Sequence, residues 1–133
     1  SVSGCAFLIS SKLFNKLNGF NENLFWMEDI ELSYRIKKLG YHNYYFPKTK
    51  IIHYQGKSSE KNQATTIQNQ LISKIKYFKI YHTPVEVFIL KSLIFLIAIS
   101  KVVILLFVYL INRKYKNKLS GYLNVLHSII LDN

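Results

Sequence analysis

Apolar residues recur at helical spacing in the segment that follows a short aromatic stretch. Leu32, Ile36 and Leu39 stand at positions i, i+4 and i+7, so they fall on one face of a helix. The pattern predicts a helix over Glu28–Leu39 that stops at Gly40. An acidic pair therefore opens this helix, where the positive end of the helix dipole favours negative charge by roughly 0.3–1 kcal/mol.

Shorter patterns predict the other elements of the first eighty residues. Apolar or tyrosine-rich runs bounded by polar residues are typical of strands, and a serine before an apolar repeat is typical of a helix start. The sequence predicts strands at Cys5–Ile9, Tyr41–Phe46 and Ile51–Tyr54, and helices at Lys12–Leu17 and Thr66–Tyr81. Cys5, the single cysteine, is expected to pack inside the first strand.

The segment Pro84–Ile111 is almost wholly apolar. It is longer than the about 20 residues that cross a bilayer, and Thr83 followed by proline predicts a capped helix start. Lys101 stands near its centre, where a lysine costs roughly 2.5–3.5 kcal/mol on membrane insertion. The sequence leaves three arrangements open: a membrane span, a helix lying in the interface, and a hairpin broken near Ser100.

Positive charge gathers in the second half of the chain. The formal net charge is +11; residues 1–60 hold eight Lys and Arg against five Asp and Glu, and residues 61–133 hold ten against two. These cations flank an apolar run and do not alternate with aromatic residues, so the pattern favours anionic lipid and disfavours nucleic acid as a partner. A final amphipathic segment, Lys118–Leu131, is also typical of a membrane surface.

Six short motifs follow one another in the first sixty residues. They are Ser3–Ser10, Phe14–Glu22 with its Gly-Phe pair, the aromatic-led Glu28-Asp29 pair, Gly40-Tyr41, Phe46-Pro47 and His53–Ser58. In this order they resemble the acceptor-side part of family 2 glycosyltransferases, especially the rhamnosyltransferase-like members. The resemblance implies an α/β architecture, namely half of a Rossmann-like GT-A domain that binds a nucleotide-sugar, followed by an all-helical, membrane-associated segment.

The resemblance gives the acidic helix start a chemical role. Asp29 matches the family's catalytic base, which takes a proton from the acceptor hydroxyl, and Glu28 would orient that base or bind acceptor hydroxyls. The alternative is that both acids only complement the helix dipole. Trp26 and Phe25 would stack on a sugar ring as substrate-binding residues, or they anchor the helix start to the core.

The resemblance also implies a divalent metal, Mn²⁺ or Mg²⁺. The family carries this ion on an Asp-x-Asp motif, which is absent from this sequence. His53 matches a supplementary metal ligand, or it caps the end of a strand. Lys57 and Ser58 are expected to close over the leaving diphosphate, or to lie in a solvated loop. The missing motif predicts that the chain is the C-terminal piece of a larger enzyme, or a truncated relative.

Together these patterns predict three parts. Residues 1–60 form the acceptor-side half of a GT-A domain, residues 61–83 a linker and amphipathic helix, and residues 84–133 a membrane-associated helical tail. The expected function is transfer of a sugar from a nucleotide-sugar to a glycan or lipid-linked acceptor in surface polysaccharide synthesis, on the cytoplasmic face of a membrane. If the native chain is this short, a partner chain supplies the donor domain. The alternative is a catalytically inactive remnant that tethers a partner to the membrane.

Overall fold

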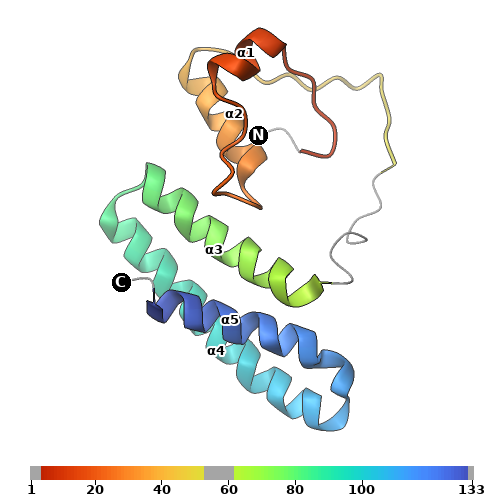
Figure 1. The fold of residues 1–133 in the computed structure, drawn as a ribbon, viewed down its shortest axis with the longest axis vertical. Coiled ribbons are helices and arrows are strands. Elements are labelled where there is room, and N and C mark those ends of the chain that lie inside the picture. The colour runs from red at the N-terminus through yellow and green to blue at the C-terminus, as the bar shows by residue number, and fades with distance from the viewer. Residues whose placement is uncertain (1–3, 53–61, 132–133) are drawn as a thin grey trace. The chain divides into compact units, whose positions relative to one another are not determined.

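The computed structural model describes residues 4–52 and 62–131, which belong to two compact units, Ser1–Gln55 and Gly56–Asn133. We call the described parts unit 1 and unit 2. Unit 1 contains α1 (Ser11–Lys16) and α2 (Glu28–Lys38); unit 2 contains α3 (Gln63–Tyr81), α4 (Pro84–Ile111), the 3₁₀ turn η2 (Arg113–Tyr115) and α5 (Lys116–Leu131) (Figure 1). The structure thus groups α3 with α4 and α5, whereas the sequence pattern set residues 61–83 apart.

The two helices of unit 1 begin and end at residues that suit those positions. The Ser10 hydroxyl accepts a hydrogen bond from the Leu13 amide at 3.3 Å, which satisfies a donor that has no partner within α1. α2 carries acidic side chains in its first turn and basic ones in its last, as the helix dipole favours. Gly40 follows α2 with φ of 82°, in the left-handed region that commonly ends helices. Both predicted helices are therefore present, within one residue at each end.

The core of unit 1 is small. Leu32 and Ile36 lie one turn apart on α2 and are 2% and 8% exposed, and Leu24 from the preceding loop is 1% exposed. Leu39, the third apolar residue of the predicted face, is instead 45% exposed at the end of the helix. Because so few apolar side chains are buried, polar contacts must stabilise much of unit 1.

The predicted α/β architecture is wrong for the part of the chain that the structure describes. Neither residues 4–52 nor residues 62–131 contain a strand, so no Rossmann-like layer is formed there. Residues 5–9 and 41–46 are turns and irregular segments; Leu8 is 100% exposed, Tyr45 is 87% exposed, and Cys5 is exposed as well. Residues 51–52 are likewise irregular, and the rest of that predicted strand lies outside the described residues. Apolar and tyrosine-rich runs favour strands only where a neighbouring strand pairs with them.

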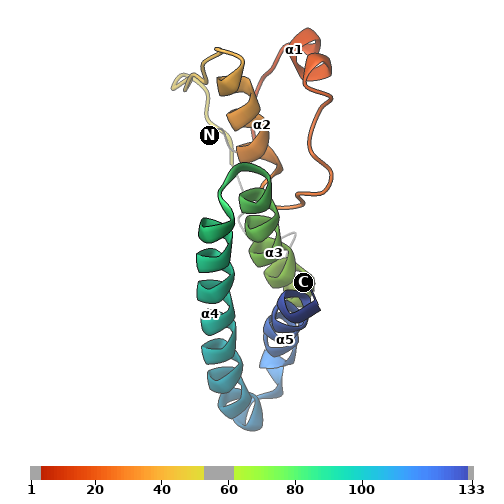
Figure 2. The same cartoon turned by 90° about the vertical axis from the view of Figure 1, so that its left-hand side faces the viewer.

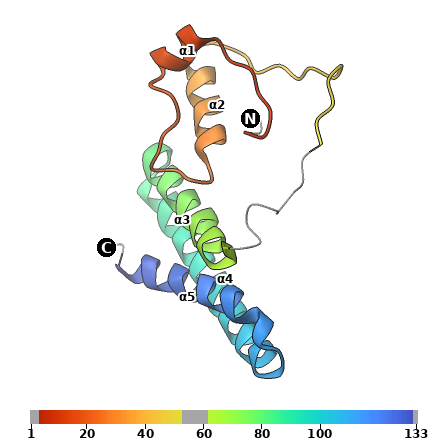
Figure 3. The same ribbon diagram turned by 45° about the vertical axis from the view of Figure 1, so that its right-hand side comes forward.

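Unit 2 is a bundle of three helices. α3 leads through a tight turn into α4, and α5 returns along α4 after the 3₁₀ turn, so that each helix contacts the other two (Figures 2 and 3). Its core consists of Ile75 from α3, Ile94 and Ala98 from α4, and Val125 from α5. Gly121 allows α5 to approach α3 closely, because a Cβ atom there would lie 3.0 Å from the Ala64 Cα.

α4 confirms the predicted apolar helix and its cap. The Thr83 hydroxyl accepts a hydrogen bond from the Glu86 amide, and the Glu86 carboxylate accepts one from the Thr83 amide at 2.8 Å. This reciprocal pair is a capping box, with Pro84 in the first turn. α4 is long and apolar enough to cross a membrane by length and composition, and only 17% of its most apolar window is buried inside the structure.

Candidate functional site

A hollow of about 810 Å³ lies in unit 1 beside the start of α2. Its lining comes from three segments: the chain start, the loop before α2, and the first turn of α2. The lining residues are Gly4, Cys5, Phe20, Asn21, Glu22, Leu24, Phe25, Trp26, Glu28 and Asp29. The structure therefore places four sequence-predicted site residues, two aromatic and two acidic, around one hollow.

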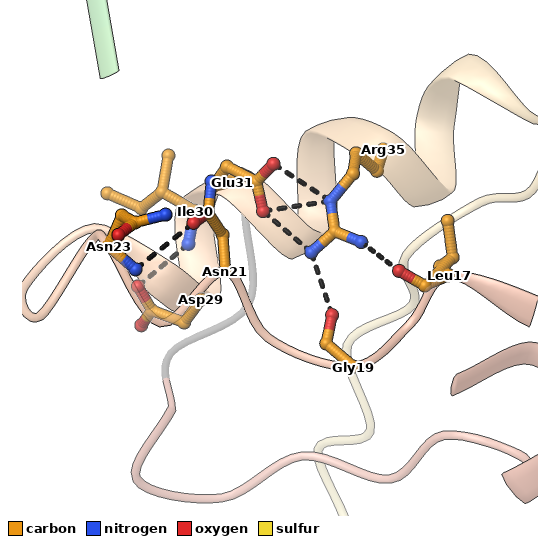
Figure 4. Close-up of polar contacts among 8 residues, drawn as sticks. All are labelled: Leu17, Gly19, Asn21, Asn23, Asp29, Ile30, Glu31 and Arg35. Atoms are coloured by element: carbon orange, nitrogen blue, oxygen red, sulfur yellow. Dashed lines mark hydrogen bonds and ion pairs between the residues drawn. The ribbon is translucent and has the colours of Figure 1, made fainter. Parts of the chain in front are cut away.

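The Asp29 carboxylate is held by backbone amides on both oxygens. Oδ2 accepts a hydrogen bond from the Gly4 amide at 2.7 Å, and Oδ1 accepts one from the Ile30 amide at 2.7 Å, the second of which Figure 4 shows. Hydrogen bonds from N–H groups to a carboxylate are among the stronger ones and fix its orientation. Each oxygen keeps a further lone pair, so Asp29 is an oriented acceptor at the edge of the hollow.

Glu28 differs from Asp29 in having an unused acceptor. Its Oε2 atom is buried and has no hydrogen-bond partner within the described residues. Buried polar atoms nearly always have a partner, and a buried acceptor without one is costly. Glu28 also lines the hollow, although this oxygen itself is covered.

Phe25 and Trp26 lie at the hollow with much of their surface in solvent. Their exposed fractions are 66% and 40%, in contrast to the fully buried Leu24 beside them. The loop that carries them is shaped by an Asx turn, in which the Asn23 amide donates to the Asn21 Oδ1 atom at 3.1 Å. Leu24 thus anchors the loop, and the two rings stay partly exposed at the hollow.

Sequence reasoning missed a polar cluster around Arg35, which connects α2 to the segment after α1. The Arg35 guanidinium donates from Nε to both carboxylate oxygens of Glu31 at 2.8 Å, from Nη2 to the Gly19 carbonyl at 2.8 Å, and from Nη1 to the Leu17 carbonyl (Figure 4). Glu31 is only 2% exposed. Asn18 and Gly19 have φ of 56° and 68°, so the chain makes a left-handed turn directly after α1.

The signal for this cluster was available in the sequence. Glu31 and Arg35 stand at i and i+4, where side chains on a helix meet. Spacing alone suggests an exposed pair of little consequence. What the spacing does not reveal is that Arg35 also reaches two backbone carbonyls, so that it connects α2 to the segment leading into the hollow.

Three sequence-predicted site residues, His53, Lys57 and Ser58, lie outside the described residues. Within residues 4–52 and 62–131, no group of three or more His, Cys, Asp or Glu side chains is placed to hold a metal ion. Glu28 and Asp29 are adjacent carboxylates without a third ligand there. We therefore assign no metal ligand in this part of the chain.

Comparison with known proteins gives a distant relationship. No family model matches the chain, and no solved structure matches it. Two curated proteins match, each named N-acetylglucosaminyl-diphospho-decaprenol L-rhamnosyltransferase, from two strains of Mycobacterium tuberculosis; both are 31% identical over 65 residues. The match covers 48% of this chain and 21% of each relative, so the chain spans about a fifth of their length. The chain is thus distantly related to a mycobacterial rhamnosyltransferase, a family 2 glycosyltransferase.

Proposed function

We propose that this chain is the acceptor-binding, base-bearing part of a glycosyltransferase that moves a sugar from a nucleotide-sugar to a glycan or lipid-linked acceptor. The observation that carries the proposal is the hollow beside α2, where Asp29 is oriented by two amides and Glu28 has an acceptor oxygen without a partner in the described part of the chain. The distant relationship to a rhamnosyltransferase supports this chemistry. The donor-binding part comes from elsewhere, in a longer chain or in a partner.

In the proposed reaction the acceptor hydroxyl enters the hollow and donates its hydrogen bond to Asp29. As its oxygen forms a bond to the anomeric carbon of the donor sugar, the bond from that carbon to the nucleoside diphosphate breaks. The hydroxyl proton passes to Asp29, and the diphosphate leaves with the electron pair. Attack opposite the leaving group inverts the configuration at the anomeric carbon.

The other pocket residues bind and orient the acceptor in this proposal. Glu28, which lines the hollow, accepts a hydrogen bond from a second hydroxyl of the sugar. Trp26 and Phe25 cover the apolar face of a ring. The divalent ion, together with His53, Lys57 and Ser58 at the diphosphate, remains a prediction from the family resemblance. Mn²⁺ or Mg²⁺ there would neutralise charge on the leaving group.

The test is Asp29→Asn in the full-length native protein, or in this chain together with its donor-binding partner. Asparagine keeps one acceptor oxygen, enough for the Gly4 amide but not for the Ile30 amide as well, and it cannot take up the proton. We expect transfer to fall at least about a hundredfold, in line with the usual contribution of a general base, while acceptor binding stays within a few fold. Glu86→Gln, which removes a carboxylate from unit 2, is the matched control. Undiminished turnover in Asp29→Asn would refute the base assignment.

The alternative function, an inactive membrane tether, is favoured by the apolar surface of α4. It differs from the proposed transferase in its response to Asp29→Asn. A tether tolerates Asp29→Asn and fails when residues 84–111 are deleted. The proposed transferase loses turnover in Asp29→Asn even while the chain stays bound to membrane.

A further inference from the structure

α4 separates its charged residues from its most exposed apolar residues. Lys91, Ile94, Ala98, Lys101 and Leu105 follow one another at spacings of three and four, so they share one stripe of the helix. Three of them, Ile94, Ala98 and Leu105, are buried against the bundle. The two lysines share this side of the helix, Lys91 half-buried and Lys101 exposed.

The opposite side of α4 carries no charge beyond its first turn. We call it the outer face and define it by Val85, Phe88, Leu96, Val103, Phe107 and Leu110, which are between 48% and 81% exposed. The hydroxyl of Ser100, near this face, donates to the Ile97 carbonyl at 2.8 Å, so it needs no water. Soluble monomers rarely expose a large contiguous apolar patch, and this face runs from the first turn of α4 to its last.

The helices packed on α4 limit how it can meet a membrane. α4 is long enough to cross, but α3 and α5 lie along it and would enter the hydrocarbon with it. α3 carries Lys74, Lys76 and Lys79, all exposed, and α5 carries Asn124 and His127, also exposed. Charged and polar groups of this kind are expensive inside the bilayer. Meeting the membrane through the outer face of α4 leaves them in water or among headgroups.

Basic residues also flank α4 at both ends. Lys74, Lys76 and Lys79 precede it, and Arg113, Lys114, Lys116 and Lys118 follow it; residues 62–131 hold nine Lys and Arg against one acidic residue. An anionic leaflet attracts such clusters, and a single crossing would remove one of them to the other side. In-plane attachment keeps both at the same surface.

We propose that unit 2 lies in one leaflet of an anionic bilayer, with the outer face of α4 in the hydrocarbon and both ends of α4 at the same surface. Lys91 and Lys101, which lie on the other side of α4 from this face, then stay out of the hydrocarbon. The inference rests on the membrane association in the proposed function and refines it. It does not depend on sugar transfer, because its tests read out topology and binding.

Topology is measured with single cysteines in the full chain, after Cys5→Ser removes the native thiol. Lys79→Cys reports the side before α4, and Lys114→Cys reports the side after it; both positions are exposed. The proteins are incorporated during synthesis into sealed vesicles that contain phosphatidylglycerol, and are treated with a membrane-impermeant maleimide. We expect both cysteines to react without lysis. If one reacts only after the vesicles are lysed, α4 crosses the bilayer and the proposal is overturned.

The lipid-facing surface is tested with Phe107→Asp, on the outer face, and Asn124→Asp, at an exposed position of α5. Both introduce one aspartate into a helix, and circular dichroism checks that helix content is kept. We expect Phe107→Asp to lower flotation with phosphatidylglycerol vesicles about tenfold, and Asn124→Asp to change it less than twofold. Equal effects, or a chain that ignores vesicles and forms a dimer through this face, would overturn the proposal.

Discussion

The two units of this chain are stabilised by different kinds of contact. Unit 1 buries few apolar side chains, and its loops are fixed by a guanidinium that connects α2 to two carbonyls of the segment after α1. Unit 2 is held by apolar side chains of three helices that meet around Ile75, Ala98 and Val125. The hydrogen bonds of unit 1 hold its loops in place but leave a hollow. The apolar side chains of unit 2 fill its core but orient no polar groups.

This difference shows in the surfaces that each unit leaves uncovered. Unit 1 leaves a hollow that is lined by Glu28 and by the oriented carboxylate of Asp29. Unit 2 leaves an apolar face along α4. The first surface offers a carboxylate acceptor beside two aromatic rings, and the second offers apolar side chains. One chain therefore carries two incomplete surfaces of opposite chemistry.

The largest expected effect is on the polar network of unit 1. Arg35→Met removes the guanidinium that pairs with the carboxylate of Glu31, which is only 2% exposed. Breaking a buried pair in this way costs about 3–5 kcal/mol, so we expect unit 1 to lose most of its stability. The readout is denaturant unfolding followed by the fluorescence of Trp26, the single tryptophan.

The matched control removes the stranded charge as well. In the double variant Glu31→Gln with Arg35→Met, no ionised carboxylate remains buried, so part of the lost stability returns. Lys37→Met, an exposed position on the same helix, changes stability by less than about 0.5 kcal/mol. A double variant no more stable than Arg35→Met would show that the lost carbonyl contacts, and not the buried charge, dominate.

A smaller effect is expected in the packing of unit 2. A side chain at Gly121 meets backbone, because a Cβ atom there lies 3.0 Å from the Ala64 Cα and 3.1 Å from the Ala64 carbonyl oxygen. Gly121→Val forces α3 and α5 apart, and overpacking of this kind costs about 1–3 kcal/mol. Thermal unfolding followed by circular dichroism measures it. Asn124→Ala, an exposed position on α5, should be neutral or slightly stabilising; equal losses would argue against a close approach at Gly121.

The sequence predicted the helices well because each carries local signals. Thr83 and Pro84 mark the start of α4, and the spacing of Leu32 and Ile36 marks α2. The strands were predicted wrongly because a strand depends on a partner that no local pattern supplies. Tyr44 and Tyr45 favour extended structure by composition, yet they are 84% and 87% exposed and pair with no strand among the described residues.

For the candidate site, the sequence identified acidic and aromatic residues that the structure places around one hollow. It did not reveal how Asp29 is held, because the Gly4 amide that binds it is 25 positions away in the chain. The role of Arg35 was equally hidden, since its carbonyl partners are set by the left-handed turn at Asn18 and Gly19. Contacts between a side chain and a distant backbone group depend on the fold, and residue patterns do not reveal them.

The smallest expected effect is on the cap of α4. Its contribution to stability depends on pH, whereas that of apolar packing does not. The Thr83 amide, then the Thr83 hydroxyl and the His82 ring, hydrogen-bond to the Glu86 carboxylate and lower its pKa below the usual 4.5. A carboxyl whose pKa is lowered by folding adds stability above its unfolded pKa, and this stability is lost as the pH falls through the folded pKa. The free energy of unfolding in urea should therefore be higher for wild type than for Glu86→Gln at about pH 7, and equal for the two proteins at about pH 2. A difference that persists at the lower pH would mean that the ionised carboxylate is not what stabilises the cap.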